Sequence, residues 1–128
     1  MGKAGDEERL RRACSFLLSK QNEDGGWGES YLSCVTMEYV PTPDRSSTVV
    51  NTAWALMSLI NAGHTDEVPL RRAARYLISQ QLDNGDWPQQ TVVGIFNRNC
   101  SISYTNYRNV FPVWALGMFH SRFGDVAA

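Results

Sequence analysis

A 60-residue repeat constrains the fold of this chain more than any other feature of its 128 residues. The segment LRRACSFLLSKQNEDGGW begins at Leu10, and LRRAARYLISQQLDNGDW begins at Leu70. The residues that recur after 60 positions are Leu10, Arg11, Arg12, Ala13, Leu17, Ser19, Gln21, Gly25 and Trp27. Residues 54–56 (WAL) return with the same shift as residues 114–116. Two blocks in one register, with no insertion between them, indicate a duplicated structural unit.

Each unit is expected to contain two helices, and the predicted units span residues 7–63 and 67–124. The first helix of each unit, at residues 7–22 and 68–82, carries its apolar side chains on one stripe. Asp66 is the expected N-cap of the later of these two helices. The pattern therefore predicts an amphipathic helix at the start of both units.

The second helix of each unit, within residues 47–63 and 109–124, is apolar around more of its circumference. Gly63 is the expected stop of the earlier helix. The later helix is apolar nearly all round, with Asn109 as its expected cap and Gly124 as its stop. A helix of this kind must be buried on several sides.

Amphipathic and buried helices alternate, which predicts an all-α fold with the outer and inner helices of an α/α barrel. Two helix pairs are too few to close a barrel, so we expect residues 1–128 to form a partial α/α toroid within a larger domain. The connection at residues 28–45 is expected to be an irregular loop. Residues 88–106 are rich in β-branched and aromatic side chains and predict short extended segments.

Composition argues against several classes of protein. Lys and Arg total 12 against 13 Asp and Glu, a net charge of -1, which does not favour nucleic-acid binding. The sequence shows neither a transmembrane run nor the apolar core of a signal peptide. Cys14, Cys34 and Cys100 form no CxxC pair, which is typical of a reducing, intracellular compartment. We expect all three to be small buried hydrophobes.

The repeated turn, QNEDGGW at residues 21–27 and QLDNGDW at residues 81–87, invites a ligand-binding interpretation. It lacks the ligand spacing of an EF-hand and the Gly-Lys-Ser/Thr of a P-loop. We therefore expect a structural turn, in which glycine permits a sharp bend after a helix, tryptophan packs back on that helix, and glutamine bonds open backbone groups. The residues kept in both turns are Gln21, Gly25, Trp27, Gln81, Gly85 and Trp87.

No constellation of metal ligands or nucleophiles stands out in the sequence. His64 and His120 lie at expected helix ends, without a cysteine or an acid at zinc-ligand spacing. No Ser/His/Asp order or nucleophile elbow is present either. We expect no metal and no organic cofactor.

Aromatic side chains gather in the last third of the chain, at Phe96, Tyr104, Tyr107, Phe111 and Trp114. We expect Phe111 and Trp114 to pack in the core. Phe96 and Tyr104 lie in a connection rather than on a helix stripe, so they are candidates for a pocket wall. Aromatic faces stabilise cations without acting as nucleophiles.

Two sets of residues carry a resemblance to a known family. The pattern R-A-x-x-F/Y-L-[LI]-S-x-Q-x-x-x-G-x-W, at residues 12–27 and 72–87, resembles the QW motif of triterpene cyclases. The tail GIFNRNCSISYTNYRNVFPVWALGMF, residues 94–119, resembles the C-terminal end of oxidosqualene cyclases, which include lanosterol and cycloartenol synthases. The resemblance extends from Glu8 to Phe123, and the tail is its more specific part.

The resemblance implies an enzyme of two α/α barrel domains that converts 2,3-oxidosqualene to lanosterol or cycloartenol without a cofactor. An aspartic acid in an Asp-Cys-Thr-Ala motif protonates the epoxide, and aromatic side chains then stabilise the cation. No Asp of this sequence is followed by Cys, so we expect the initiating acid to lie upstream and no catalytic residue to lie in this chain. The resemblance also implies peripheral attachment of the parent to the endoplasmic reticulum or to lipid droplets, through parts absent here.

By position, Phe96 and Tyr104 resemble cavity residues that face the cation, and Ile102 resembles a neighbouring wall residue. The QW residues carry over as scaffold. The resulting hypothesis is a cyclase fragment that is inactive without the rest of the cyclase chain. A non-catalytic helical-repeat binding module and a squalene–hopene cyclase-like enzyme remain alternatives. The β-subunit of protein prenyltransferases shares the α/α barrel but needs zinc ligands that this sequence does not show.

Overall fold

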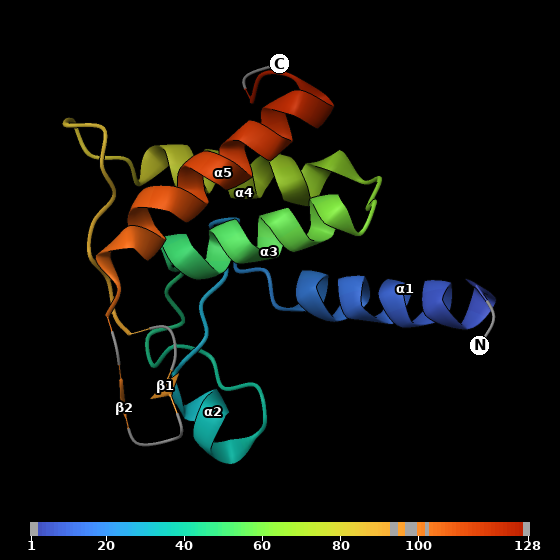
Figure 1. Ribbon diagram of the computed structural model, residues 1–128, viewed down its shortest axis with the longest axis horizontal. Helices are drawn as coiled ribbons and strands as arrows, with labels where there is room; N and C mark the ends of the chain where they lie inside the picture. The colour runs from blue at the N-terminus through green and yellow to red at the C-terminus, as the bar shows by residue number, and fades with distance from the viewer. Residues whose placement is uncertain (1–2, 93–94, 97–99, 102, 127–128) are drawn as a thin grey trace.

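The computed structural model describes residues 3–92, 95–96, 100–101 and 103–126. In these residues, helices α3, α4 and α5 pack together, while α1 extends away from them (Figure 1). The elements in chain order are α1 (Lys3–Ser19), α2 (Leu32–Thr36), α3 (Val49–Asn61), α4 (Glu67–Ser79), β1 (Ile95–Phe96), β2 (Cys100–Ser101) and α5 (Thr105–Phe123). The predicted all-α class is confirmed.

The core lies between α3, α4 and α5. Its largest fully buried apolar side chains include Leu56, Leu59, Leu70, Leu77 and Phe119. Trp27 and Trp87 join the same cluster from the two turns. Each turn therefore adds one large aromatic ring to a core that helices otherwise build, and burial of such side chains is the main stabilising contribution to the fold.

The ends of the helices follow mostly from local chemistry. The carboxylate of Asp66 accepts a hydrogen bond from Val68 N (3.0 Å), which confirms the predicted N-cap of α4. The hydroxyl of Thr48 caps α3 by accepting from Asn51 N (3.2 Å). The predicted stops are confirmed as well, since Gly63 follows the end of α3 and Gly124 is the C-cap of α5.

Two predictions for α5 are wrong. Asn109 is not its cap, because the helix begins at Thr105 with Tyr104 in the N-cap position and no side-chain cap bond. The helix is also not buried around its whole circumference, since Trp114 is 55% exposed and Val110 and Val113 are half exposed. In the described part of the chain, α3 and α4 cover one side of α5, and its other side has no helix against it.

The connections differ in part from expectation. The loop at residues 28–45 is irregular except for the short helix α2. The extended segments predicted within residues 88–106 are present as an antiparallel pair, in which Ile95 lies opposite Ser101 and Phe96 opposite Cys100. No helix that the structure describes is long and apolar enough to cross a bilayer.

Burial of all three cysteines was the wrong expectation. Cys34 on α2 and Cys100 in β2 are exposed, because both lie in connections that stand outside the core. Cys14 is half-buried and packs against the edge of the core from α1. Of the three, only the cysteine on a helix stripe follows the predicted pattern.

Candidate functional site

The first turn (residues 21–27) is closed by its own polar groups. Gln21 Nε2 donates to Gly25 O (2.8 Å), and the indole Nε1 of Trp27 donates to Leu17 O (2.7 Å) in the last turn of α1. The carboxylate of Asp24 accepts from Gly26 N (2.9 Å). Leu17 O also accepts from Lys20 N (2.9 Å), so the tryptophan adds a second donor to a carbonyl at the end of α1.

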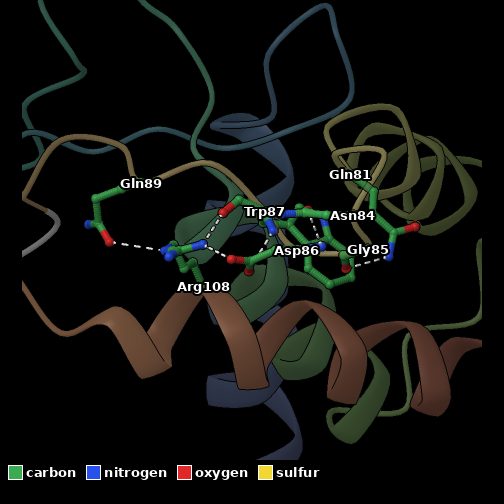
Figure 2. Close-up of polar contacts among 7 residues, drawn as sticks. All are labelled: Gln81, Asn84, Gly85, Asp86, Trp87, Gln89 and Arg108. Atoms are coloured by element: carbon green, nitrogen blue, oxygen red, sulfur yellow. Dashed lines mark hydrogen bonds and ion pairs between the residues drawn. The ribbon is translucent and has the colours of Figure 1, made fainter.

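The second turn (residues 81–87) repeats this geometry 60 residues later. Gln81 Nε2 donates to Gly85 O (2.8 Å) (Figure 2), and Trp87 Nε1 donates to Leu77 O (2.8 Å). The side-chain oxygen of Asn84 accepts from Asp86 N (3.0 Å), as Asp24 does in the first turn. Aspartate and asparagine both offer this acceptor, so the exchange of one for the other does not alter the turn.

Both turns make the hydrogen bonds that the structural interpretation of the repeated motif predicts. Their acidic residue serves the backbone, and the described residues hold no group of three or more His, Cys, Asp or Glu side chains arranged to bind a metal ion. The glutamine closes each turn, and the tryptophan bonds a carbonyl near the end of the preceding helix, α1 or α4.

The first turn is also covered by α4. Gln21 Nε2 makes a second hydrogen bond to Pro69 O (2.8 Å), in the first turn of that helix. The guanidinium of Arg72 donates to Asn22 O (3.0 Å) and Glu23 O (2.8 Å). Helix α4 is therefore hydrogen-bonded directly to the turn that follows α1.

Tyr76 adds a buried hydrogen bond to this junction, and it gives a prediction for high pH. Its hydroxyl donates to Ser47 O (2.7 Å), and burial raises its pKa from 10.0 to about 12. The neutral phenol is thus favoured by the fold, so its stabilising contribution is complete below pH 10 and is lost as the pH rises toward 12.

In Tyr76→Phe, the free energy of unfolding should fall less steeply between pH 10 and pH 12 than in the unmodified chain. Urea unfolding at several alkaline pH values measures the difference, and equal slopes would contradict the assignment.

The second turn is bound by a side chain of α5 instead, the guanidinium of Arg108 (Figure 2). The guanidinium Nη1 of Arg108 bonds both the Asp86 carboxylate and the carbonyl of Trp87, and its Nε donates to Gln89 Oε1 (3.2 Å). Bonds from the Trp87 N–H and from Arg108 lower the pKa of Asp86, which is therefore held as a carboxylate near neutral pH. An acid in this state is a poor proton donor.

Sequence reasoning missed Arg108. The repeat offers a signal that could have found it, because Arg108 lies 60 positions after Thr48. Thr48 bonds the equivalent carbonyl in the first unit, since its backbone N–H donates to Trp27 O (2.8 Å). The equivalent positions 48 and 108 therefore both donate a hydrogen bond to the tryptophan carbonyl of their unit. Thr48 does so with its backbone N–H, and Arg108 with its guanidinium.

Five aromatic side chains form an aromatic row along α5 and the facing side of α3: Trp54, Tyr104, Tyr107, Phe111 and Trp114. The ring of Trp54 lies edge-on to Tyr107 (5.6 Å between centroids) and to Phe111 (5.4 Å). Tyr104 lies 5.1 Å from Tyr107. Such edge-to-face and tilted arrangements are favourable for aromatic pairs. Trp54, which sequence reasoning treated only as part of the repeat, belongs to this row.

The three residues predicted to line a cavity lie in different parts of the chain, and the structure describes only two of them. Tyr104 lies at the start of α5, half exposed, at one end of the aromatic row. The backbone of Phe96 lies in β1, whose hairpin stands away from α3, α4 and α5 (Figure 1). Ile102 lies outside the described residues. A common wall formed by these three residues stays a prediction.

Trp114 and Phe111 also differ from each other. The expected core position is wrong for Trp114, which is exposed, whereas Phe111 is partly buried and packs against the core. Their rings are nearly parallel, with centroids 6.5 Å apart. The aromatic row therefore runs from the core edge at Phe111 to two half-exposed ends, Tyr104 and Trp114.

The arrangement can stabilise positive charge but offers little for proton transfer. Among the described residues, the cation–π contacts involve Phe16, Tyr39, Phe119 and Phe123, and none involves a member of the aromatic row. The hollow beside Tyr104 and Arg108 has a volume of about 20 Å³, roughly that of one water molecule. A second hollow, which Trp54 lines on the other side of the row, has a volume of about 180 Å³.

Comparisons with known proteins agree on one group. A family model described as the squalene-hopene cyclase C-terminal domain matches residues 1–121. The human lanosterol synthase is 48% identical over 118 residues, 92% of this chain and 16% of that protein. The mouse lanosterol synthase is 50% identical over 116 residues, 91% of this chain and 16% of that protein. The Dictyostelium discoideum cycloartenol synthase is 51% identical over 93 residues, 73% of this chain and 13% of that protein. The chain thus spans about 16% of the length of the first two relatives.

Proposed function

Because this chain belongs to the squalene-hopene cyclase C-terminal domain family, we propose that it forms part of the α/α barrel of an oxidosqualene cyclase. In this proposal, residues 1–128 contribute two helix pairs of a toroid, with repeat units at residues 7–63 and 67–124. The duplicated turns and the similarity to lanosterol and cycloartenol synthases support it. Lanosterol or cycloartenol is the proposed product of the complete enzyme.

The aromatic row is the observation that carries the proposal. Cyclisation of 2,3-oxidosqualene moves positive charge through a hydrocarbon, and the wall around it must stabilise that charge without capturing it. Ring faces do this through their quadrupoles. Tyr104 and Trp114 are half exposed at the two ends of the row, so their rings are available to an apolar cation. Phe96 and Ile102 are proposed as further wall residues beside Tyr104.

Initiation of the reaction needs an acid that is still protonated near neutral pH. Such an acid has a raised pKa, as burial in a dry cavity produces. Asp86, the carboxylate fastened by Arg108, has a lowered pKa instead, so it does not meet this requirement. We therefore propose that the chain supplies wall and scaffold, and that the initiating acid comes from the rest of the cyclase.

The expected result for this chain alone is no cyclisation. Incubation of the purified chain with (S)-2,3-oxidosqualene should return the substrate unchanged, as measured by gas chromatography with mass spectrometry. A lanosterol synthase assayed in parallel controls for substrate quality. Any tetracyclic sterol formed by the chain alone would show that it holds an initiating acid of its own.

The family description also names squalene–hopene cyclases, so squalene is the alternative substrate of the complete enzyme. The relatives named above favour the oxidised substrate. Peripheral membrane association, and attachment to the endoplasmic reticulum or to lipid droplets, stay predictions for the complete enzyme.

A further inference from the structure

A chain of side-chain hydrogen bonds connects the second turn with the start of α5. Arg108, which is bound to that turn, donates from Nε to Gln89 Oε1 (3.2 Å) (Figure 2). Gln89 then donates from Nε2 to the hydroxyl oxygen of Ser103 (2.7 Å). The side-chain amide is thus used at both ends, as an acceptor from the guanidinium and as a donor to the hydroxyl. Ser103 directly precedes Tyr104 in the sequence.

The segment that carries Gln89 is attached to the core on both sides. Trp87, two residues earlier, is buried in the core cluster. Directly after Gln89, the side-chain oxygen of Gln90 accepts a hydrogen bond from Val49 N (2.7 Å), at the first residue of α3. The amide of Gln89 is therefore presented from a defined place in the fold.

The start of α5 lacks the usual side-chain cap. Tyr104 occupies the N-cap position without a side-chain cap bond, and it is half exposed. Helix ends without a cap open more readily than the middle of a helix. The ring of Tyr104 lies 5.1 Å from that of Tyr107, but this contact joins two residues of one helical turn. The bond from Gln89 to Ser103 instead ties the helix start to another part of the fold.

Holding the second turn does not explain the bond to Ser103. Arg108 already binds the turn at two points, the carboxylate of Asp86 and the carbonyl of Trp87. The bond from Gln89 leads away from the turn, to the residue before Tyr104. Its effect therefore falls on the start of α5.

We propose that Gln89 and Ser103 are positioning residues, which hold Tyr104 in a fixed place relative to the second turn. Arg108 orients Gln89 by binding its side-chain oxygen, which leaves Nε2 directed at Ser103. The consequence for the reaction rests on the proposed function. A wall residue stabilises a cation only while its ring lies where the charge develops, and a shift of about 1 Å can lower a rate about a hundredfold.

Hydrogen exchange of the 128-residue chain tests the positioning role without any catalysis. The amide of Tyr107 donates to Tyr104 O (3.1 Å), so its exchange rate reports whether residue 104 is held in place. We expect this amide to exchange about fivefold faster in Gln89→Leu and in Ser103→Ala, as for the loss of one hydrogen bond. Amides in the middle of α5 should keep their rates, which separates a local effect from general destabilisation. Nuclear magnetic resonance measures both sets of amides.

Two further variants serve as controls. Glutamate in Gln89→Glu can accept from both Arg108 and the hydroxyl of Ser103, so this variant should exchange like the unmodified chain. Gln80→Leu is the matched control, because the Gln80 amide lies 3.5 Å from the hydroxyl of its own neighbour, Ser79, and bonds no part of α5 that the structure describes. It should leave the exchange at the start of α5 unchanged.

A chimera in which this chain replaces the matching part of the human lanosterol synthase tests the consequence for the reaction. Gln89→Leu should change the ratio of cyclised products in the same direction as Tyr104→Ala, and Gln89→Glu should restore the unmodified ratio. A substitution that only destabilises the protein would lower all products alike.

The proposal is overturned if the amide of Tyr107 exchanges equally in the unmodified chain, Gln89→Leu and Ser103→Ala. It is also overturned if Gln80→Leu accelerates this exchange as much as Gln89→Leu, or if Gln89→Leu leaves the product ratio of an active chimera unchanged. An unmodified chimera that gives no cyclised product would contradict the proposed function instead, and the exchange rates would then decide the positioning role.

Discussion

Replacing Gly25 by alanine is expected to destabilise the fold by about 2–5 kcal/mol, more than the same replacement at Gly85. Both residues have positive φ, 90° and 87°, so the strain of a side chain in this conformation is common to the two sites. Only at Gly25 does the new methyl group meet a neighbour, since Arg72 O would lie 2.7 Å away. Gly85→Ala should cost about 1–2 kcal/mol, from backbone strain alone.

Urea unfolding followed by circular dichroism measures both variants, and Gly85→Ala is the matched control. Equal destabilisation by the two substitutions would contradict the account, because it would mean that α4 does not rest on the first turn.

Trp27→Ala is expected to cost about 3–5 kcal/mol, enough to unfold much of a marginally stable domain. The side chain is 4% exposed and lies in the core cluster. Its indole N–H donates to Leu17 O (2.7 Å), which also accepts from Lys20 N (2.9 Å), so the substitution removes one of the two donors to this carbonyl at the end of α1. The loss combines a cavity with an unmade hydrogen bond.

Trp27→Phe separates these two effects. Phenylalanine keeps much of the apolar volume and removes the donor, so we expect a loss of about 1–3 kcal/mol, clearly smaller than for alanine. Circular dichroism is the suitable signal, since the substitution alters tryptophan fluorescence directly. A change below about 1 kcal/mol for Trp27→Ala would show that the ring is not part of a cooperative core.

The sequence predicts the duplicated turns well, and the reason is local. The bonds from Gln21 to Gly25 O and from Trp27 to Leu17 O join groups no more than ten residues apart, so the spacing of the motif specifies them. Asp66 capping α4 is equally local. The 60-residue shift then carries the same hydrogen bonds to the second turn.

Features that depend on distant residues could not be predicted in the same way. Arg108 bonds Asp86 and Trp87 across more than 20 positions, and only its place 60 residues after Thr48 links it to the tryptophan carbonyl. The cap of α5 was misplaced because Tyr104, at the N-cap, provides no side-chain bond and so carries no capping signal. The exposure of Trp114 depends on which helices lie against α5, and this is a property of the assembly rather than of the helix.

The most direct test of the proposed function is a chimera in which this chain replaces the matching part of the human lanosterol synthase, to which it is 48% identical. The account predicts that the chimera converts 2,3-oxidosqualene to a tetracyclic sterol, and that Tyr104→Ala in the chimera lowers the yield or diverts the product while the protein stays folded. A chimera that is folded and binds substrate, but gives no cyclised product, would contradict the claim that this chain is a functional part of the cyclase wall.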